Sequence, residues 1–200
     1  MLRQYFGRGL AVALAMVAIG SGHVRADSGG QAVRWSRVAS DPRWVQGDVT
    51  VNAPPDMVWA RLARVDQWPQ TLTDIERLKV LDRQPDERGH THWKVELETR
   101  TLGHGMLGYE VDSDPARTLV LSTNRMGVSV VAQTLVRPGP TPHQANVVYS
   151  FFIELSGLPS LLISEKSLHE KQEHMVDVTL GDIGRAFPNP APAPAPTAAR

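Results

Sequence analysis

The chain has 200 residues, which suggests a single domain, and its 21 Lys and Arg residues balance 21 Asp and Glu residues. This balance, without any basic stripe along the chain, excludes nucleic-acid binding driven by charge. The sequence contains no cysteine, so stability must come from a hydrophobic core rather than from disulfides.

The first 26 residues have the pattern of a secretory signal peptide. Arg3 and Arg8 give a positive start, residues 10–19 (LAVALAMVAI) form an apolar run, and residues 24–26 (VRA) offer a cleavage site. The run is shorter than the about 20 residues of a spanning helix, although an uncleaved membrane anchor stays as the alternative. We therefore expect export to the periplasm or the medium, with 18 basic and 21 acidic residues left after cleavage.

The rest of the chain divides into three parts. Residues 27–43 are polar and contain glycine, so we expect a loose N-terminal lead-in. Residues 44–187 carry regular patterns and form the predicted ligand-binding domain. Residues 188–200 (PNPAPAPAPTAAR) alternate Ala and Pro, which cannot form helix or sheet ladders, so we expect a disordered, extended tail.

The domain begins with a strand and a short helix. Residues 44–51 (WVQGDVTV) alternate as a strand does. Pro55 suits the start of a helix, and apolar residues at positions 58, 62 and 65 give that helix one apolar face. The helix must stop before Pro69, so Trp68 and Pro69 form a corner, with one further helical turn over residues 70–73.

Six strands and a long helix follow. The strand patterns have period 2 and are separated by turn-forming residues; they centre on residues 78–80, 93–99, 107–111, 119–123, 128–132 and 147–155. Pro159 is placed for the first turn of the last helix, whose apolar positions are 161, 168, 175, 180 and 183. Gly181 and Gly184 are the points where we expect this helix to bend or end.

This order predicts an α+β helix-grip fold. A curved antiparallel sheet of six to seven strands wraps around a long C-terminal helix, with one or two short helices after the first strand. A single helix cannot fill the space inside a strongly twisted sheet, so a cavity lined by the inward residues should remain.

The opening of the domain resembles the START-like, helix-grip proteins of the SRPBCC superfamily. These proteins share an Ala-Pro turn, a V-W-x-x-L helix and a D-x-W-P corner, which correspond here to Ala53-Pro54, Val58-Trp59, Leu62, and Asp66 to Pro69. The similarity is greatest to the polyketide cyclase/dehydrase and lipid-transport group, including coenzyme Q-binding members. Gly157-Leu158-Pro159 before the last helix is similar too. The resemblance implies binding of a hydrophobic, often lipid-like molecule between the sheet and that helix.

The inward positions give the predicted ligand-binding residues. They are Trp93, Val95, Leu97, Tyr109, Val111, Leu119, Leu121, Val130, Tyr149, Phe151, Ile153, Leu168 and Met175. The aromatic members have two interpretations, core packing or pocket wall, and in a helix-grip fold both can hold. Trp59 and Trp68 are assigned to structure.

Several motifs that suggest other chemistry are outweighed by ordinary interpretations. Residues 103–108 (GHGMLG) match a dinucleotide fingerprint, but a strand follows them where a helix is needed. Residues 169–174 (HEKQEH) lack the second His of a zinc motif and indicate surface helix pairs. His90 and His92 share a strand face but have no third ligand at an informative spacing. We predict no cofactor, no metal site and no catalytic residue.

Three functions stay open. The first is an exported carrier for a lipid or other hydrophobic small molecule, with transient membrane contact. The second is a cyclase/dehydrase-like enzyme with an acid or base in the same cavity. The third is an interaction module with a filled cavity, which a space too small for about ten heavy atoms would favour. The sequence does not determine the ligand, the protein partners or the oligomeric state.

Overall fold

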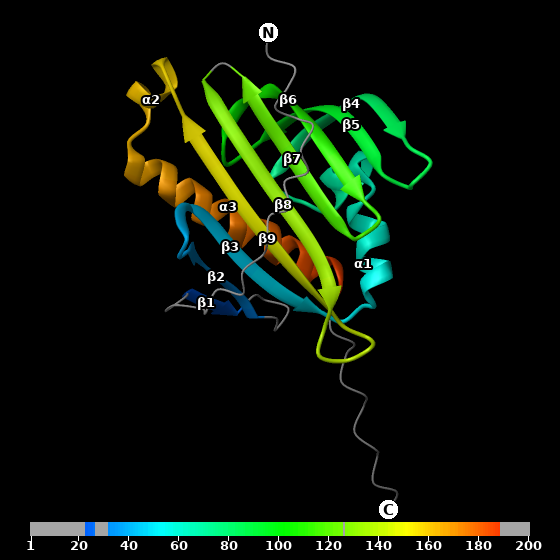
Figure 1. Ribbon diagram of the computed structural model, residues 1–200. Coiled ribbons are helices and arrows are strands. Elements are labelled where there is room, and N and C mark those ends of the chain that lie inside the picture. The colour runs from blue at the N-terminus through cyan, green and yellow to red at the C-terminus, as the bar shows by residue number, and fades with distance from the viewer. Residues whose placement is uncertain (1–22, 27–31, 126, 189–200) are drawn as a thin grey trace, which may run out of the picture.

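The computed structural model describes residues 23–26, 32–125 and 127–188, which form one antiparallel sheet with helices on one face (Figure 1). The strands are His23–Ala26 (β1), Ala32–Val38 (β2), Asp41–Val51 (β3), Ile75–Pro85 (β4), Thr91–Thr99 (β5), Gly103–Asp114 (β6), Thr118–Arg125 (β7), Val128–Pro138 (β8) and Ala145–Leu155 (β9). The helices are Pro55–Leu62 (α1), the 3-10 helix Val65–Gln70 (η1), Leu158–Leu162 (α2) and Glu165–Ala186 (α3). The strand order is β1-β2-β3-β9-β8-β7-β6-β5-β4.

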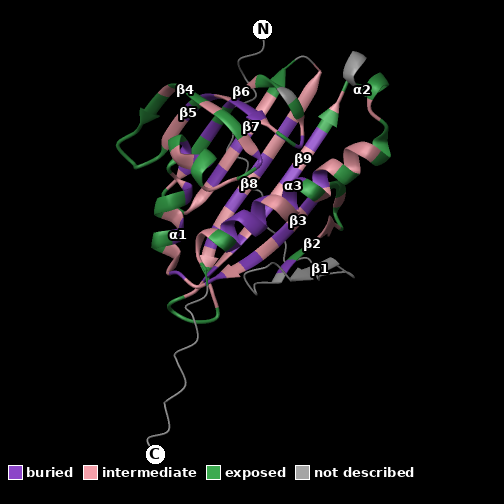
Figure 2. Ribbon diagram, turned by 180° about the vertical axis from the view of Figure 1, so that it is seen from behind, coloured by how far each residue is buried: buried purple, intermediate pink, exposed green. Residues whose placement is uncertain are grey.

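The predicted helix-grip architecture is confirmed. All seven predicted strands are present as β3 to β9, and α3 lies along one face of the sheet. Buried residues alternate along the strands, and in α3 they lie between Gln172 and Gly184 rather than in its first turns (Figure 2). The short helix after the first predicted strand corresponds to α1. The further helical turn was expected over residues 70–73, whereas η1 lies earlier, over Val65–Gln70, and contains the Trp68-Pro69 corner itself.

The lead-in differs from the expectation. Ala32–Val38 form β2, which pairs with β3 through Arg34 opposite Asp48 and Trp35 opposite Gly47. Val33 is buried, yet Arg34, Ser36 and Arg37 leave the strand with little apolar alternation to reveal it. β3 also begins at Asp41, three residues before the predicted strand.

The structure describes only a small part of the predicted leader and none of the predicted tail after residue 188. Residues 1–22 of the predicted signal peptide and residues 189–200 of the predicted tail lie outside the described residues. His23–Ala26, the last residues of the predicted leader, form the edge strand β1 on β2. Within the described ranges no helix is long and apolar enough to span a membrane.

The Trp-Pro corner is held by a buried hydrogen bond. Val58 and Leu62 bury the inner face of α1, and Pro69 lies inside η1. The Trp68 ring is buried, and its Nε1 donates to the Leu62 carbonyl oxygen at 2.8 Å. This bond satisfies a carbonyl at the end of α1, where helical partners run out, and so fixes the turn into β4.

The last helix begins later than predicted. Leu158–Leu162 form the separate helix α2, Ile163 is extended, and the Ser164 side chain caps α3 by accepting from the Ser167 N–H. Such a serine cap supplies a helix start that the apolar spacing alone does not show. Gly181 and Gly184 do not end the helix, which continues to Ala186 with both glycines buried.

α3 covers only one side of the sheet, where it packs on β2, β3 and β9. Gly47 in β3 permits the approach, because a Cβ there would lie 2.7 Å from Leu180 Cδ1 and 2.6 Å from the Arg34 carbonyl oxygen. Leu180 is fully buried. The helix therefore lies close to the sheet at β3 and leaves space toward β5–β8.

We predict that Gly47→Ala lowers the free energy of unfolding by about 1–3 kcal/mol, because overpacking at a tight contact costs that much. Urea unfolding measures the loss. Gly108→Ala is the control, since its added Cβ would meet only the movable Arg125 side chain, 3.0 Å away. Equal losses in both variants would contradict the close approach of α3 at Gly47.

Candidate functional site: an apolar cavity between α3 and the sheet

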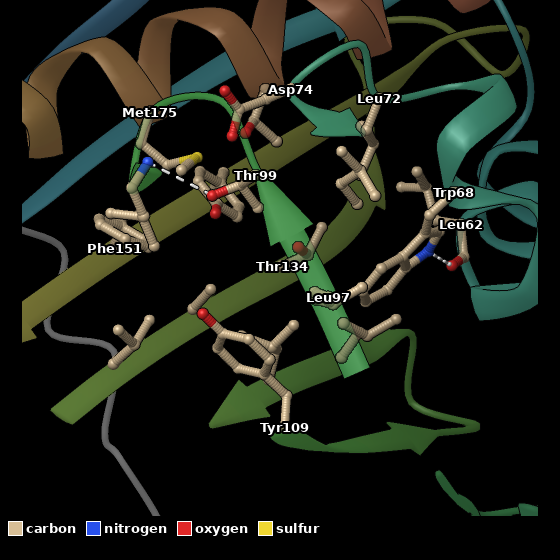
Figure 3. A pocket seen from close by; sticks show the side chains of 18 of the residues that line it. Leu62, Trp68, Leu72, Asp74, Leu97, Thr99, Tyr109, Thr134, Phe151 and Met175 are labelled. Atoms are coloured by element: carbon tan, nitrogen blue, oxygen red, sulfur yellow. Dashed lines mark hydrogen bonds between the residues drawn. The ribbon is translucent and has the colours of Figure 1, made fainter. Parts of the chain in front are cut away.

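A cavity of about 90 Å³ lies between α3 and the inner face of β5–β9, beside η1 (Figure 3). Most of its wall is aliphatic or aromatic. The lining residues are Leu62, Trp68, Leu72, Asp74, Ile75, Leu97, Thr99, Leu102, Tyr109, Leu119, Leu121, Val130, Ala132, Thr134, Tyr149, Phe151, Met175, Thr179 and Ile183. The half-buried members, Leu72, Ile75, Thr99 and Leu102, mark the side where the cavity approaches the surface.

Eight of the thirteen predicted ligand-binding residues line this cavity: Leu97, Tyr109, Leu119, Leu121, Val130, Tyr149, Phe151 and Met175. Trp93, Val95 and Val111 are buried in the core away from it. Ile153 and Leu168 instead line a separate hollow of about 240 Å³ between the end of β9, α2 and the start of α3. The alternation of apolar and polar residues thus identifies the inward face of each strand. The position of a residue along its strand then decides whether it lines the cavity.

The cavity is also lined by residues outside the predicted ligand-binding set. Trp68, assigned to structure alone, both makes the corner and lines the wall. Ala132 and Thr134 continue the inward alternation of β8 but are small or polar. Thr179 and Ile183 lie one and two turns beyond Met175 on α3. The helical spacing of the last two could have identified them.

Asp74 is the most informative residue that sequence reasoning missed. It follows the η1 corner, where no strand or helix period applies, and only 6 % of its surface is exposed. Its Oδ1 accepts from the backbone N–H and the hydroxyl of Thr101, at 3.0 and 2.6 Å. Its Oδ2 is buried without a hydrogen-bond partner. In Figure 3 Asp74 lies beside α3 at the edge of the cavity.

Two phenol groups lie in the same wall, together with the hydroxyls of Thr99, Thr134 and Thr179. Burial raises the pKa of Tyr109 to about 12, with a smaller contribution from the negative charge of Asp74. Burial also raises the pKa of Tyr149 well above its usual value, against the opposing effect of a hydrogen bond with Thr179. Both hydroxyls therefore stay protonated at neutral pH and act as neutral hydrogen-bonding groups.

Two polar contacts tie the surface side of the cavity to α3. Asp182, buried in α3, accepts from the Thr73 N–H at 2.5 Å and from the Thr73 hydroxyl at 2.9 Å. The Lys171 ammonium group donates to the Thr101 carbonyl oxygen at 2.5 Å. Residues 73 and 101 flank Leu72 and Leu102, so these contacts position the half-buried lining residues.

The other motifs have structural roles. Residues 103–108 begin β6, with Gly103 and Gly105 at positive φ, as expected for a turn and strand rather than a nucleotide loop. Glu173 pairs with Arg37 of β2 at 2.8 Å rather than along its own helix. His92 lies 2.7 Å from Asp112, and the described ranges contain no group of three residues suited to a metal ion.

Comparisons with known proteins agree with this architecture. Residues 51–131 match the family described as polyketide cyclase / dehydrase and lipid transport, which confirms the resemblance read from the sequence. A search of the curated proteins found no match. The structure has a START-like fold.

Three solved structures illustrate the likeness. The lipid transfer and protein localization domain of human StarD13 is 16% identical, with a TM-score of 0.55 over 84% of this chain and 90% of that one. The Zhui aromatase/cyclase from Streptomyces sp. R1128 is 15% identical, with a TM-score of 0.55 over 72% and 92%. A STAR-related lipid transfer protein from Xanthomonas axonopodis is 15% identical, with a TM-score of 0.52 over 84% and 99%. At these identities the likeness establishes the fold alone.

We predict that stability falls steeply between pH 10 and 12. The raised pKa of Tyr109 in the folded state means that the unfolded chain loses its proton first as the pH rises. Stability is therefore fully present below pH 10 and is lost by about 1.4 kcal/mol per pH unit for each such tyrosine. Urea unfolding at several pH values measures the slope.

The variants Tyr109→Phe and Tyr149→Phe should each reduce that slope by one proton, whatever their effect on stability at neutral pH. The absorbance change of phenolate formation should follow unfolding rather than precede it. An unchanged slope in both variants would contradict burial of the two phenols.

Proposed function

We propose that this protein is an exported carrier that binds a lipid or another hydrophobic small molecule between α3 and the sheet. The observation that carries the proposal is the apolar wall, in which Asp74 is the only charged residue among the nineteen that line the cavity. Burial would drive binding, since each CH₂ group removed from water contributes about 0.8 kcal/mol. No reaction is needed for such a role.

The size of the cavity adds a condition. Its volume of about 90 Å³ is below the roughly 300–1,000 Å³ of typical ligand sites. A lipid chain would enter only if the wall moved outward. The half-buried Leu72 and Leu102 lie in connecting segments rather than in the centre of the sheet, so they are the side chains we expect to move.

The same volume favours a second candidate, a non-catalytic interaction module with a filled cavity. A six-carbon ring occupies an engineered cavity of about 150 Å³, so 90 Å³ holds fewer than ten heavy atoms without movement. The enzyme alternative is supported by one observation, the carboxylate of Asp74 in the wall. The two phenols in the same wall are neutral at physiological pH and would not act as bases there.

We predict that the purified protein carries or takes up an apolar ligand. Native mass spectrometry should show co-purified lipid, and N-phenyl-1-naphthylamine should gain fluorescence on binding and be displaced by added lipid. Ala132→Leu places three more carbons at the cavity wall and should weaken probe binding about tenfold or more. Val131→Leu is the matched control, because Val131 precedes it on β8 and faces away.

Absence of both co-purified lipid and probe binding would reject the carrier and leave the filled module. Equal weakening in the two variants would show that the probe binds elsewhere.

Export has its own test. Expressed in a Gram-negative host, the full chain should be recovered from the periplasm, with a mature N-terminus at Asp27, after the predicted cleavage site. N-terminal sequencing and the intact mass decide the point. Recovery with Met1 in the cytoplasm would reject export, and recovery with Met1 in the membrane fraction would favour the uncleaved anchor.

A further inference from the structure

The Asp74 carboxylate is incompletely paired inside the protein. Oδ1 accepts both donors of Thr101, whereas Oδ2 is buried with no partner. A buried carboxylate oxygen without a donor is costly, and buried polar atoms in folded proteins are nearly always hydrogen-bonded. The arrangement therefore calls for a donor that the described part of the chain does not itself supply.

No ion pair holds the Asp74 carboxyl group in the described part of the chain; the nearby Lys171 ammonium donates to the Thr101 carbonyl oxygen instead. The hydroxyl of Tyr149 is engaged with Thr179. Asp74 lines the same cavity as Leu97, Phe151 and Met175, so its carboxyl group lies beside the space that a ligand would fill. Because Oδ2 itself is buried, the outward movement of the wall that a ligand requires must also uncover this atom.

We propose that the cavity selects hydrophobic molecules that carry a hydrogen-bond donor, an ammonium or hydroxyl group, which binds the free Oδ2 of Asp74. This inference rests on the proposed carrier function and adds the chemical class of its ligand. The two hydrogen bonds from Thr101 hold the carboxylate in one orientation, so that Oδ2 is the atom left for the ligand. The hydrocarbon part of the ligand packs on the apolar wall.

Three probes of equal chain length separate the contributions: hexane, hexanol and hexylamine, each measured at pH 7 by displacement of N-phenyl-1-naphthylamine. A hydrogen bond to a charged group contributes enough for roughly a ten- to hundredfold gain in affinity. We expect hexylamine and hexanol to bind more tightly than hexane by that factor. A bound water on Oδ2 instead of a ligand would give three similar affinities.

Asp74→Asn tests the assignment at a single atom. The amide oxygen must face the two Thr101 donors, which places the NH₂ group where Oδ2 was and replaces an acceptor by a donor. Hexylamine, which can only donate when protonated, should lose its advantage entirely. Hexanol can accept a hydrogen bond and should keep part of it, while hexane should bind as before.

Thr134→Val tests whether another polar group of the wall binds the donor instead, because it removes a buried hydroxyl from the same cavity at nearly constant volume. It should leave the ratio of hexylamine to hexane affinity unchanged. If Asp74→Asn does not fold, Asp74→Ser removes the carboxylate with less bulk and is measured in the same way.

The outcomes separate the inference from the function on which it rests. Equal binding of the three probes to the wild-type protein overturns the donor selection and leaves the carrier intact. A hexylamine preference that survives both Asp74 variants overturns it too, since the amine then binds elsewhere. Failure of every probe, the fluorescent one included, rejects the carrier and the inference together.

Discussion

The cavity depends on one constraint, which is that α3, the one long helix of the described residues, packs on only three strands of the nine-stranded sheet, namely β2, β3 and β9. α3 packs closely on β3 at Gly47, where Leu180 occupies the space that a side chain would need. On the other side, Asp182 binds Thr73 of the segment between η1 and β4. These contacts fix α3 on both sides, toward β3 and toward the segment before β4. Between α3 and β5–β8 a space therefore remains, which the inward side chains of these strands and the η1 corner only partly fill.

This constraint explains why polar groups gather at one edge of an apolar cavity. Thr73 and Asp74 are consecutive, and they bind in different directions, one to α3 and the other to Thr101 after β5. Lys171 joins the same region from α3. The half-buried Leu72 and Leu102 lie among these contacts. The side of the cavity where Thr73, Asp74 and Lys171 make these contacts is therefore also the side where, under the proposed function, a ligand would enter and bind.

The sequence predicts the fold better than the site, for a physical reason. Alternation along a strand reports which face is inward, and it correctly placed Tyr109, Tyr149 and Phe151 in the wall. It does not report how far along the strand the helix lies, so Trp93 was expected at a cavity that it does not reach. Asp74 follows a proline corner, where no period exists, and only the folded chain brings it to Thr101.

Two errors in the predicted elements, at β2 and at the start of α3, have a related cause. The segment that forms β2 was expected to be loose because residues 27–43 are polar and contain glycine, whereas pairing with β3 requires only its backbone groups. The start of α3 was placed too early because Pro159 and Leu161 fit a helix, while the Ser164 cap decides the actual start. In each case tertiary contacts or a cap overrode the local pattern.

The central claim is that hydrophobic molecules bind between α3 and the sheet. Methyl NMR spectra during a titration with hexylamine test it most directly, because the methyl groups report the place of binding. The account predicts shifts at Leu97, Val130 and Met175, which line the cavity, and none at the exposed Leu161 and Leu162 of α2. Shifts confined to Leu161 and Leu162, with the cavity methyl groups unchanged, would contradict it.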